Sequence, residues 1–297
     1  MNNFLDNLEK LSIPYKTCEP LKKHTSFKIG GNAEYFITPK SINQCQDAIN
    51  CCNNHSVKYK IIGKGSNLLV SDKGYDGAII CTSFLNDIKI LDGNKIYCEA
   101  GVTLANLCLF ALNNSLSGLE FAYGIPGNVG GAVYMNAGAY NGEMKYVVES
   151  CTFLDSNNNI TTFENDKLDF SYRHSIFCKN NGCILSVILS LTVAPKDEIK
   201  SKMDDLISRR KEKQPLDFPS AGSTFKRPDG SYASLLVDQC GLKGFCIGDA
   251  QVSEKHAGFV INRGNATCQD VLELIQHIQN VVYDKTGYKL ETEVEII

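Results

Sequence analysis

The sequence lacks the features that identify several common classes of protein. Its net charge is −3 at pH 7, so the chain has no overall positive charge with which to hold a nucleic-acid backbone. Its longest apolar stretch, residues 183–194, is interrupted by serines and is shorter than the about 18 residues that a membrane-spanning helix needs. Residues 1–14 mix acidic and basic residues with apolar ones, unlike a signal peptide. We therefore expect a cytoplasmic protein with no nucleic-acid partner and no membrane insertion.

The sequence also has no C-x-x-C motif, although it contains 13 cysteines. An odd number of cysteines in a chain without an export signal argues against a disulfide framework. The adjacent pair Cys51 and Cys52 does not match the usual spacing of zinc ligands. We interpret most cysteines as small buried apolar residues in a reducing compartment and expect no metal site.

Neither common nucleotide-binding fingerprint is present. The segment 63–69, GKGSNLL, follows a predicted strand, but Leu68 stands where G-x-G-x-x-G requires its third glycine. No G-x-x-x-x-G-K-[ST] occurs. These absences argue against an ordinary dinucleotide-binding dehydrogenase and against a nucleotide kinase, and the GKGSN segment alone is a weak signal.

Hydrophobic periodicity and capping residues predict a mixture of helices and strands. Helices are expected over 3–12, from Ile42 after a cap at Ser41, over 104–113, from 196 to near Pro215, and from a cap at Thr267 to Gly287. Strands are expected over 33–39, 58–62, 77–82, 95–100, 149–155, 159–163, 183–193 and 290–297. The pattern indicates an α+β protein with a β-α-β start and a mostly antiparallel half from Gly74 to Val193.

Glycine is concentrated in one segment of the chain. Seven of the 24 glycines lie between Gly118 and Gly142. Glycines at this density let main-chain N–H groups approach a ligand such as a diphosphate without interference from Cβ atoms. A tight turn followed by a bulged strand is the structural alternative, and we favour ligand binding.

Several long blocks occur together in one order along the chain. They are HTSFKIGG (24–31), GKGSNLL (63–69), GIPGNVGGAVYMNAGAY (124–140), SYRHS (171–175), KQPLDFPSAGSTFKRP (213–228), IGDAQVSEKHAGFVIN (247–262) and LETEVEI (290–296). In these blocks and their order, the chain closely resembles the UDP-N-acetylenolpyruvoylglucosamine reductase family (MurB, UDP-N-acetylmuramate dehydrogenases) over residues 20–297. In its length, and in the short path from Val187 to Arg210, the chain resembles the shorter branch of this family, which lacks an extra tyrosine-bearing loop.

The resemblance implies an FAD-binding region of the vanillyl-alcohol-oxidase (PCMH) type with two subdomains, followed by a C-terminal α+β substrate-binding domain. We expect residues 1–19 to form an N-terminal helix and lead-in, 20–194 the FAD-binding domain (subdomains about 20–73 and 74–194), and 195–297 the substrate domain. FAD would be held non-covalently, and His24 is expected to be a packing or surface residue. Cofactor contacts are expected from Gly63, Lys64, Gly65, Ser66, Asn67, Leu68, Gly124, Pro126, Gly127, Asn128, Gly130, Gly131, Asn136 and Gly138.

The resemblance also implies the reaction. NADPH reduces the flavin, and the flavin then passes hydride to UDP-N-acetylglucosamine enolpyruvate, giving UDP-N-acetylmuramate for peptidoglycan. Arg173 matches the catalytic arginine, Ser223 the proton donor, and Glu293 an acid or polarising partner. From the residues alone, Thr224 is an alternative to Ser223, and strand periodicity does not choose among Glu291, Glu293 and Glu295.

Substrate contacts are expected from a further set of residues. Arg210 and Lys213 match the family's R-x-x-K-x-P spacing, although basic residues at a helix end can simply favour the helix dipole. Tyr172, Lys226, Arg227 and Gln251 are further candidates. Lys255 and Asn262 are weaker ones. The partners are therefore small molecules, and no obligate protein partner is evident.

Two other functions deserve comparison with the reductase. One is a different flavin enzyme of the same superfamily, such as a hydroxy-acid or alcohol oxidase, and the blocks from Gln214 to Glu293 argue against it. The other is a non-catalytic nucleotide-binding protein, which the presence of Arg173, Ser223 and Glu293 opposes.

Overall fold

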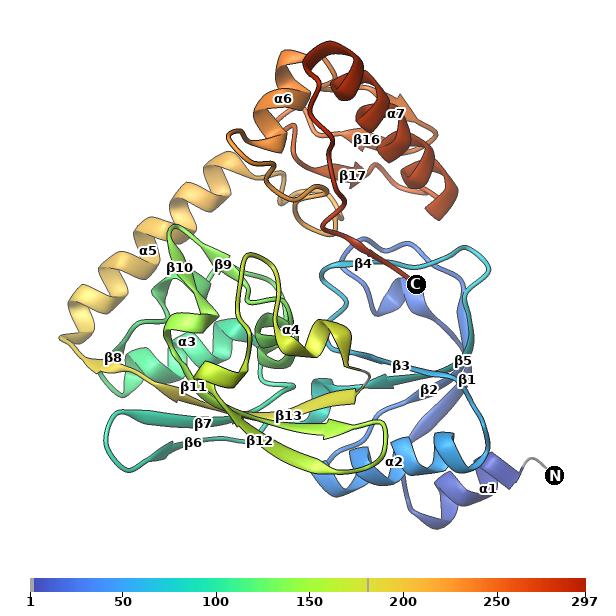
Figure 1. Ribbon diagram of the computed structural model, residues 1–297, viewed down its shortest axis with the longest axis vertical. Coiled ribbons are helices and arrows are strands. Elements are labelled where there is room, and N and C mark those ends of the chain that lie inside the picture. The colour runs from blue at the N-terminus through green and yellow to red at the C-terminus, as the bar shows by residue number, and fades with distance from the viewer. Residues whose placement is uncertain (1–2, 181) are drawn as a thin grey trace. The chain divides into compact units, whose positions relative to one another are not determined.

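The computed structural model describes residues 3–180 and 182–297, and its mixed helices and strands confirm the α+β class (Figure 1). The helices are α1 (Asn3–Lys10), α2 (Ile42–Asn54), α3 (Leu104–Asn113), α4 (Val129–Tyr134), α5 (Lys196–Lys213), α6 (Ala233–Gln239) and α7 (Cys268–Thr286).

The strands are short, and many have two or three residues. They are β1 (Tyr15–Pro20), β2 (Asn32–Ile37), β3 (Tyr59–Ile62), β4 (Leu68–Leu69), β5 (Tyr75–Cys81), β6 (Ile88–Leu91), β7 (Lys95–Glu99), β8 (Leu116–Ser117), β9 (Gly138–Ala139), β10 (Gly142–Glu143), β11 (Val148–Asp155), β12 (Ile160–Glu164), β13 (Gly182–Ser190), β14 (Thr192–Val193), β15 (Cys246–Ile247), β16 (Ala250–Val252), β17 (Val260–Asn262) and β18 (Glu295–Ile296).

The chain divides into two compact units that are interleaved in sequence. Unit 1 contains Met1–Thr17, Tyr35–Lys64 and Gly77–Arg210, and unit 2 contains Cys18–Glu34, Gly65–Asp76 and Lys211–Ile297. The sequence analysis predicted three contiguous regions and did not predict this interleaving. The predicted domain boundaries stay a prediction.

A four-stranded sheet has the order β1-β2-β5-β3. β3 and β5 pair in parallel, with Tyr59 opposite Ala78 and Ile62 opposite Cys81. The segment 77–82 was expected in the antiparallel half, and this was wrong, because β5 completes the sheet begun by β2 and β3. The predicted β-α-β start is therefore present, with β5 between its two strands.

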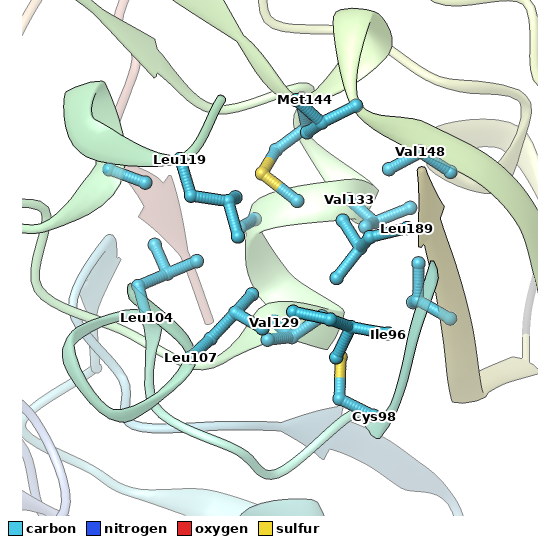
Figure 2. Close-up of a cluster of buried hydrophobic side chains, with 14 of the residues drawn as sticks. Ile96, Cys98, Leu104, Leu107, Leu119, Val129, Val133, Met144, Val148 and Leu189 are labelled. Atoms are coloured by element: carbon cyan, nitrogen blue, oxygen red, sulfur yellow. The ribbon is translucent and has the colours of Figure 1, made fainter. Parts of the chain in front are cut away.

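A five-stranded antiparallel sheet, β12-β11-β13-β7-β6, belongs to unit 1. Figure 2 shows the core formed by side chains of β7, β11 and β13 with side chains of α3 and α4, including Ile96, Val129 and Leu189. A second cluster contains Cys183 and Leu185 together with side chains of α1 and α2. Because β13 contributes to both clusters, its sequence is an almost continuous apolar run.

The predicted helix starts in unit 1 agree with the structure. The Ser41 side chain accepts a hydrogen bond from the Gln44 N–H at the start of α2, and Thr103 does the same for the Asn106 N–H at the start of α3. α4 was not predicted, since its residues 129–134 were considered only as a glycine-rich turn or bulged strand.

Unit 2 has its own core around α6, α7 and the sheet β15-β16-β17. α7 has the predicted capping box between Thr267 and Asp270 and ends at Gly287, whose φ of +76° is left-handed. α6 was missed by the sequence analysis. Phe27, Ile29 and Leu69 are buried in the same core, which explains why two early segments of the chain belong to this unit.

The last predicted strand, 290–297, is shorter in the structure. Only Glu295–Ile296 form β18, which pairs in parallel with β4, Glu295 lying opposite Leu68. Just before β18, Thr292 makes an isolated antiparallel bridge with Phe225. Among residues 3–180 and 182–297, no helix is long and apolar enough to cross a membrane.

Candidate active site

The two glycine-rich segments approach each other in unit 1. A Cβ added to Gly63 would lie 2.8 Å from Oδ1 of Asn128, so the start of the GKGSN segment lies directly against the GIPGN segment. The buried Asn128 amide donates to the Gly101 carbonyl, and its Oδ1 accepts from Ser83 Oγ at 3.4 Å. The Asn128 side chain therefore fixes the loop, and its predicted cofactor contact would involve the main chain.

The rest of GIPGNVGG leads into α4. The N–H groups of Val129 and Gly130 donate to the carbonyls of Val102 and Ala100 at 2.8 and 2.9 Å. A Cβ at the exposed Gly131, by contrast, would meet no heavy atom within 4 Å. The open main chain at Gly131 fits the close approach of a diphosphate.

The continuation of GKGSN lies in unit 2. Gly65 has a φ of +59°, and a Cβ there would lie 2.3 Å from the His24 carbonyl oxygen. The glycine is thus needed for the packing of this loop on the HTSFKIGG block. His24 also contacts Glu19, Nε2 to Oε1 at 2.9 Å, which agrees with its expected packing role.

The segments that contain Ser223 and Glu293 lie side by side in unit 2. The Glu293 N–H donates to the Thr224 carbonyl at 2.8 Å, and the Lys226 N–H donates to the Glu291 carbonyl at 2.8 Å. Nδ2 of Asn67 donates to the Glu293 carbonyl at 3.0 Å. The segment that contains Glu293 is therefore joined to the Ser223 segment by main-chain hydrogen bonds, and to the GKGSN loop by the Asn67 side chain.

The two neighbouring hydroxyl groups have different surroundings. Thr224 is 3% exposed, and its Oγ1 accepts a hydrogen bond from the Val260 N–H at 3.0 Å. Ser223 is partly exposed and follows Gly222, beside which a Cβ would find no atom within 4 Å. Because Thr224 is buried and Ser223 is partly exposed, Ser223 is the more accessible of the two residues. The sequence alone did not decide between them.

The three glutamates of the last segment also differ. Glu291 is exposed and contacts Lys226, Oε2 to Nζ at 3.5 Å. Glu295 is paired through its N–H with the Asn67 carbonyl in the β18 region. The Glu293 main chain is bonded to Thr224, the residue that follows Ser223. This favours Glu293, the glutamate that the family pattern selects.

Arg173 lies in a tight turn of unit 1. Ser171 and His174 exchange both main-chain hydrogen bonds, at 3.1 and 3.2 Å, and Arg173 has a φ of +53°. Nη2 of Arg173 donates to the Gly138 carbonyl at 3.3 Å, and its Cζ lies 5.0 Å from the centre of the Tyr172 ring. A partly buried guanidinium is thus presented by a backbone conformation that non-glycine residues rarely adopt.

The predicted substrate-binding residues are distributed over both units. In unit 1, Arg210 is partly buried beside Gly124, and burial lowers the pKa of its guanidinium. In unit 2, Lys213 is exposed, Lys226 is partly exposed, and Nε2 of Gln251 donates to the Gly244 carbonyl at 3.1 Å.

The weaker candidates have structural partners in unit 2. Nζ of Lys255 donates to the Lys211 carbonyl at 2.7 Å. The buried Asn262 donates to the Phe27 carbonyl and accepts from the N–H groups of Gly264 and Ala266.

Comparison with known proteins gives two family matches and full-length relatives. Residues 33–164 match the FAD binding domain family, and residues 214–297 match the family "UDP-N-acetylenolpyruvoylglucosamine reductase, C-terminal domain". The chain is 51% identical over 279 residues to the UDP-N-acetylenolpyruvoylglucosamine reductase of Clostridium botulinum strain Hall, covering 94% of this chain and 91% of the relative. The chain belongs to the UDP-N-acetylenolpyruvoylglucosamine reductase family.

Further matches within the UDP-N-acetylenolpyruvoylglucosamine reductase family agree. The reductase of Caldanaerobacter subterraneus subsp. tengcongensis is 50% identical over 279 residues, covering 94% of this chain and 92% of that one. The crystal structure of the reductase from Thermus caldophilus has a TM-score of 0.81 at 33% identity, covering 96% of this chain and 98% of that chain. Members of this family are FAD- and NADPH-dependent oxidoreductases that reduce enolpyruvyl-UDP-N-acetylglucosamine in peptidoglycan synthesis, and the predicted fold, cofactors and function are confirmed.

Sequence reasoning missed a group of polar residues next to the Arg173 turn. Glu143 and Lys145 follow the glycine-rich block directly, and both contact Asn136, which was expected only as a cofactor ligand. Their proximity in sequence to Asn136 was the only available signal, since the link to Ser171 exists only in the folded chain.

Proposed function

We propose that this chain reduces the enolpyruvyl double bond with Ser223 as proton donor, Arg173 as the group that stabilises charge on the substrate carboxylate, and Glu293 as acid or polarising partner. The observation that supports it best is the main-chain pairing beside Ser223, in which the Glu293 N–H donates to the Thr224 carbonyl at 2.8 Å. This pairing holds a partly exposed hydroxyl and a carboxyl on neighbouring segments. When bound, FAD would supply the hydride-transfer chemistry between NADPH and the double bond.

Arg173 is proposed to meet the substrate carboxylate. Negative charge builds up on this carboxylate as the double bond is reduced, and a planar guanidinium matches it with two parallel donors. The Gly138 carbonyl, which accepts from Nη2 at 3.3 Å, fixes one edge of the guanidinium. Preorganised donors of this kind stabilise a transition state because they need no reorganisation during the reaction.

Ser223 is proposed to donate the proton that completes the lactyl ether. A serine hydroxyl is a weak acid, so its contribution depends on being held at the position where strong basicity develops. Glu293 is proposed to polarise the same region. A carboxyl that works in its protonated form there would need a raised pKa.

The cofactor would be held by main chain rather than by charged side chains. The residues proposed for this are Gly63, Lys64, Gly65, Ser66, Asn67 and Leu68 of the first segment, and Gly124, Pro126, Gly127, Asn128, Gly130, Gly131 and Gly138 of the second. The open position beside Gly131 supports this assignment. Arg210, Lys213, Lys226, Gln251 and Tyr172 are proposed to anchor the sugar nucleotide, whose diphosphate suits arginine and lysine donors.

We further propose a cytoplasmic location and no obligate protein partner. The 13 cysteines, all unpaired, support a reducing compartment. The net charge of −3 gives no reason to expect a nucleic-acid partner.

The proposal is tested by measuring the two half-reactions of Ser223→Ala separately. Reduction of the flavin by NADPH should stay nearly unchanged, because it needs no proton from Ser223. Reoxidation by the enolpyruvyl substrate should slow by about 10²–10⁴-fold, the usual contribution of a general acid. Stopped-flow absorbance of the flavin under anaerobic conditions gives both rates.

Thr224→Val is the matched control, because it removes the neighbouring hydroxyl while keeping the side-chain shape. It should lower stability by about 1 kcal/mol through loss of the bond to Val260 N–H. Its reoxidation rate should stay close to that of the wild type. Fast reoxidation in Ser223→Ala, or a slow rate in Thr224→Val only, would exclude Ser223 as the proton donor.

A further inference from the structure

The turn that presents Arg173 is held at its base by a buried asparagine. Nδ2 of Asn136 donates to the Ser171 carbonyl at 2.9 Å, and the same carbonyl closes the turn by accepting from the His174 N–H at 3.2 Å. Asn136 itself is 0% exposed. The asparagine therefore reaches the Arg173 turn through main chain, over 35 residues of sequence.

Both amide hydrogens of Asn136 are used by the protein. Besides the Ser171 carbonyl, Nδ2 donates to Oε2 of Glu143 at 2.9 Å, and Oδ1 accepts from the Lys145 N–H at 2.9 Å. These partners account for both amide hydrogens and for one acceptor position of the amide oxygen. A side chain in this position has no donor left for a cofactor.

The partners of Asn136 are fixed in turn. Nζ of Lys145 lies 2.9 Å from Oε2 of Glu143, and Glu143 pairs with Gly138 in the β9–β10 hairpin. Burial alone would raise the pKa of the Glu143 carboxyl, but hydrogen bonds from Lys145 and Asn136 and the charges of Lys145 and Arg173 lower it overall. The carboxyl is therefore ionised at neutral pH, and as an anion it is a strong acceptor for the Asn136 amide.

The same hairpin also contacts the other end of Arg173. The Gly138 carbonyl of β9 accepts from Nη2 of Arg173, and Glu143 of β10 lies opposite Gly138 in the register. The Arg173 backbone and guanidinium are thus both fixed by one short segment, residues 136–145. The left-handed φ of Arg173 is a conformation that persists only where its surroundings determine it.

We propose that Asn136 is a positioning residue for Arg173, acting through the Ser171 carbonyl with Glu143 and Lys145 as its support, and is not a side-chain ligand of the cofactor. The inference rests on the proposed function, which gives Arg173 its role toward the substrate carboxylate. Misplacing a catalytic group by about 1 Å can cost about 10²-fold in rate. Loss of the Asn136 amide should therefore affect only the step that uses Arg173.

The test uses Asn136→Gly and Asn136→Asp in the full-length holoenzyme. Glycine accepts the φ of +44° found at this position and deletes the amide, whereas aspartate keeps the shape and replaces the donor with a charge facing Glu143. Both variants should keep their flavin content and their rate of flavin reduction by NADPH. Reoxidation by the enolpyruvyl substrate should slow by about 10–10²-fold.

A double-mutant cycle with Arg173→Ala separates positioning from a direct role. If Asn136 acts through Arg173, then Asn136→Gly combined with Arg173→Ala should reoxidise no more slowly than Arg173→Ala alone. Asn53→Ala is the matched control, because Asn53 makes the same kind of bond, to the Ser156 carbonyl at 2.8 Å, and belongs to α2 and not to the segment 136–145. It should leave both half-reactions unchanged.

Three results would overturn the inference. They are loss of flavin from both Asn136 variants at normal stability, additive losses in the double mutant, and wild-type reoxidation in Asn136→Gly while Arg173→Ala is slow. If Arg173→Ala itself reoxidises at the wild-type rate, the proposed function of Arg173 fails instead, and the two failures are thus distinguished.

Discussion

Single residues of the same chemistry have different surroundings in this protein. Ser223 and Thr224 are adjacent hydroxyls, yet the threonine is buried against the Val260 N–H and the serine is partly exposed. Asn128 and Asn136 both belong to the glycine-rich block, and both use their amides inside the protein. Side chains near a cofactor segment can thus serve the loop that presents the main chain, which a sequence motif does not distinguish from direct binding.

Gly131 allows ligand binding and stability to be separated. Since a Cβ at this position meets no protein atom within 4 Å, Gly131→Ala should not strain the chain. Alanine in α4 should even stabilise the apoprotein by about 0.5–1 kcal/mol. If the diphosphate approaches this main chain, FAD affinity should fall about tenfold or more, about 1.4 kcal/mol.

The measurement is FAD titration of the apoprotein together with urea unfolding. Gly264→Ala is the matched control, because Gly264 is also exposed and a Cβ there meets only Asp249 Oδ2, at 3.6 Å. It should leave FAD affinity unchanged. Unchanged affinity in Gly131→Ala would remove this position from the proposed cofactor cradle.

At the scale of elements, some contacts of a helix come from residues next to it in sequence, and others come from distant segments. The caps of α2 and α7 come from residues at the helix ends, Ser41 and Thr267. The start of α7 has an additional partner, because the Asp72 carboxylate accepts from the N–H groups of Cys268 and Gln269 at 2.8 and 3.1 Å. The second partner could not be predicted, since it depends on the early segment 65–76 folding with α7.

A buried carboxylate links the 3₁₀ helix Glu120–Ala122 to α5. Glu120 is 3% exposed and accepts from Ser117 Oγ at 2.6 Å and from the Gly118 N–H at 3.1 Å, with Nζ of Lys202 at 3.5 Å. Burial would raise the pKa of Glu120, but these hydrogen bonds and the lysine lower it overall. The folded protein therefore favours the ionised form more than the unfolded chain does.

This difference predicts how stability depends on pH. A carboxyl with a lowered folded pKa contributes stability that is present above its unfolded pKa of about 4.3 and is lost as pH falls through the folded pKa. Glu120→Gln should lose about 1–3 kcal/mol at pH 7 and show a smaller further loss in acid. Urea unfolding from neutral to acidic pH measures both effects.

Glu164→Gln, in the exposed strand β12, serves as the control for this prediction. Its unfolding free energy should follow that of the wild type at every pH. If the unfolding free energies of the wild type and Glu120→Gln fell in parallel as the pH is lowered, the role given to the Glu120 carboxylate would be contradicted.

At the scale of the whole molecule, the cysteines behave as core residues. Ten of the 13 are buried, Cys178 and Cys246 are partly buried, and only Cys18 is exposed. Burial raises the pKa of several thiols, to about 12 for Cys52 and about 11 for Cys268, which keeps them unreactive. The interpretation of the cysteines as small apolar residues agrees with this burial.

A thiol titration tests this distribution. In the native protein a soluble thiol reagent should modify Cys18 rapidly and Cys178 and Cys246 more slowly, and all 13 cysteines should react after unfolding without reductant. Mass spectrometry of partly labelled protein identifies the sites. Fewer reactive thiols in the unfolded protein than in its sequence would indicate disulfides and contradict the unpaired state.

The sequence by itself determined the local structure, the family and the residue types of the chemistry. Periodicity and caps located α2, α3 and α7, because side chains near in sequence decide where a helix starts and ends. The glycine-rich blocks and the motifs around Arg173, Ser223 and Glu293 gave the reductase family, since those motifs are contiguous in the chain.

Only the tertiary structure decided which segments fold together and which of two similar residues is accessible. Phe27, Ile29 and Leu69 entered the core of unit 2, and the short β18 and α6 formed, through contacts between segments far apart in sequence. Contacts between distant segments also bury the Thr224 hydroxyl and leave Ser223 partly exposed, and they form the bond between Asn136 and Ser171. Burial and hydrogen bonding depend on neighbours in space, and a linear pattern does not contain those neighbours.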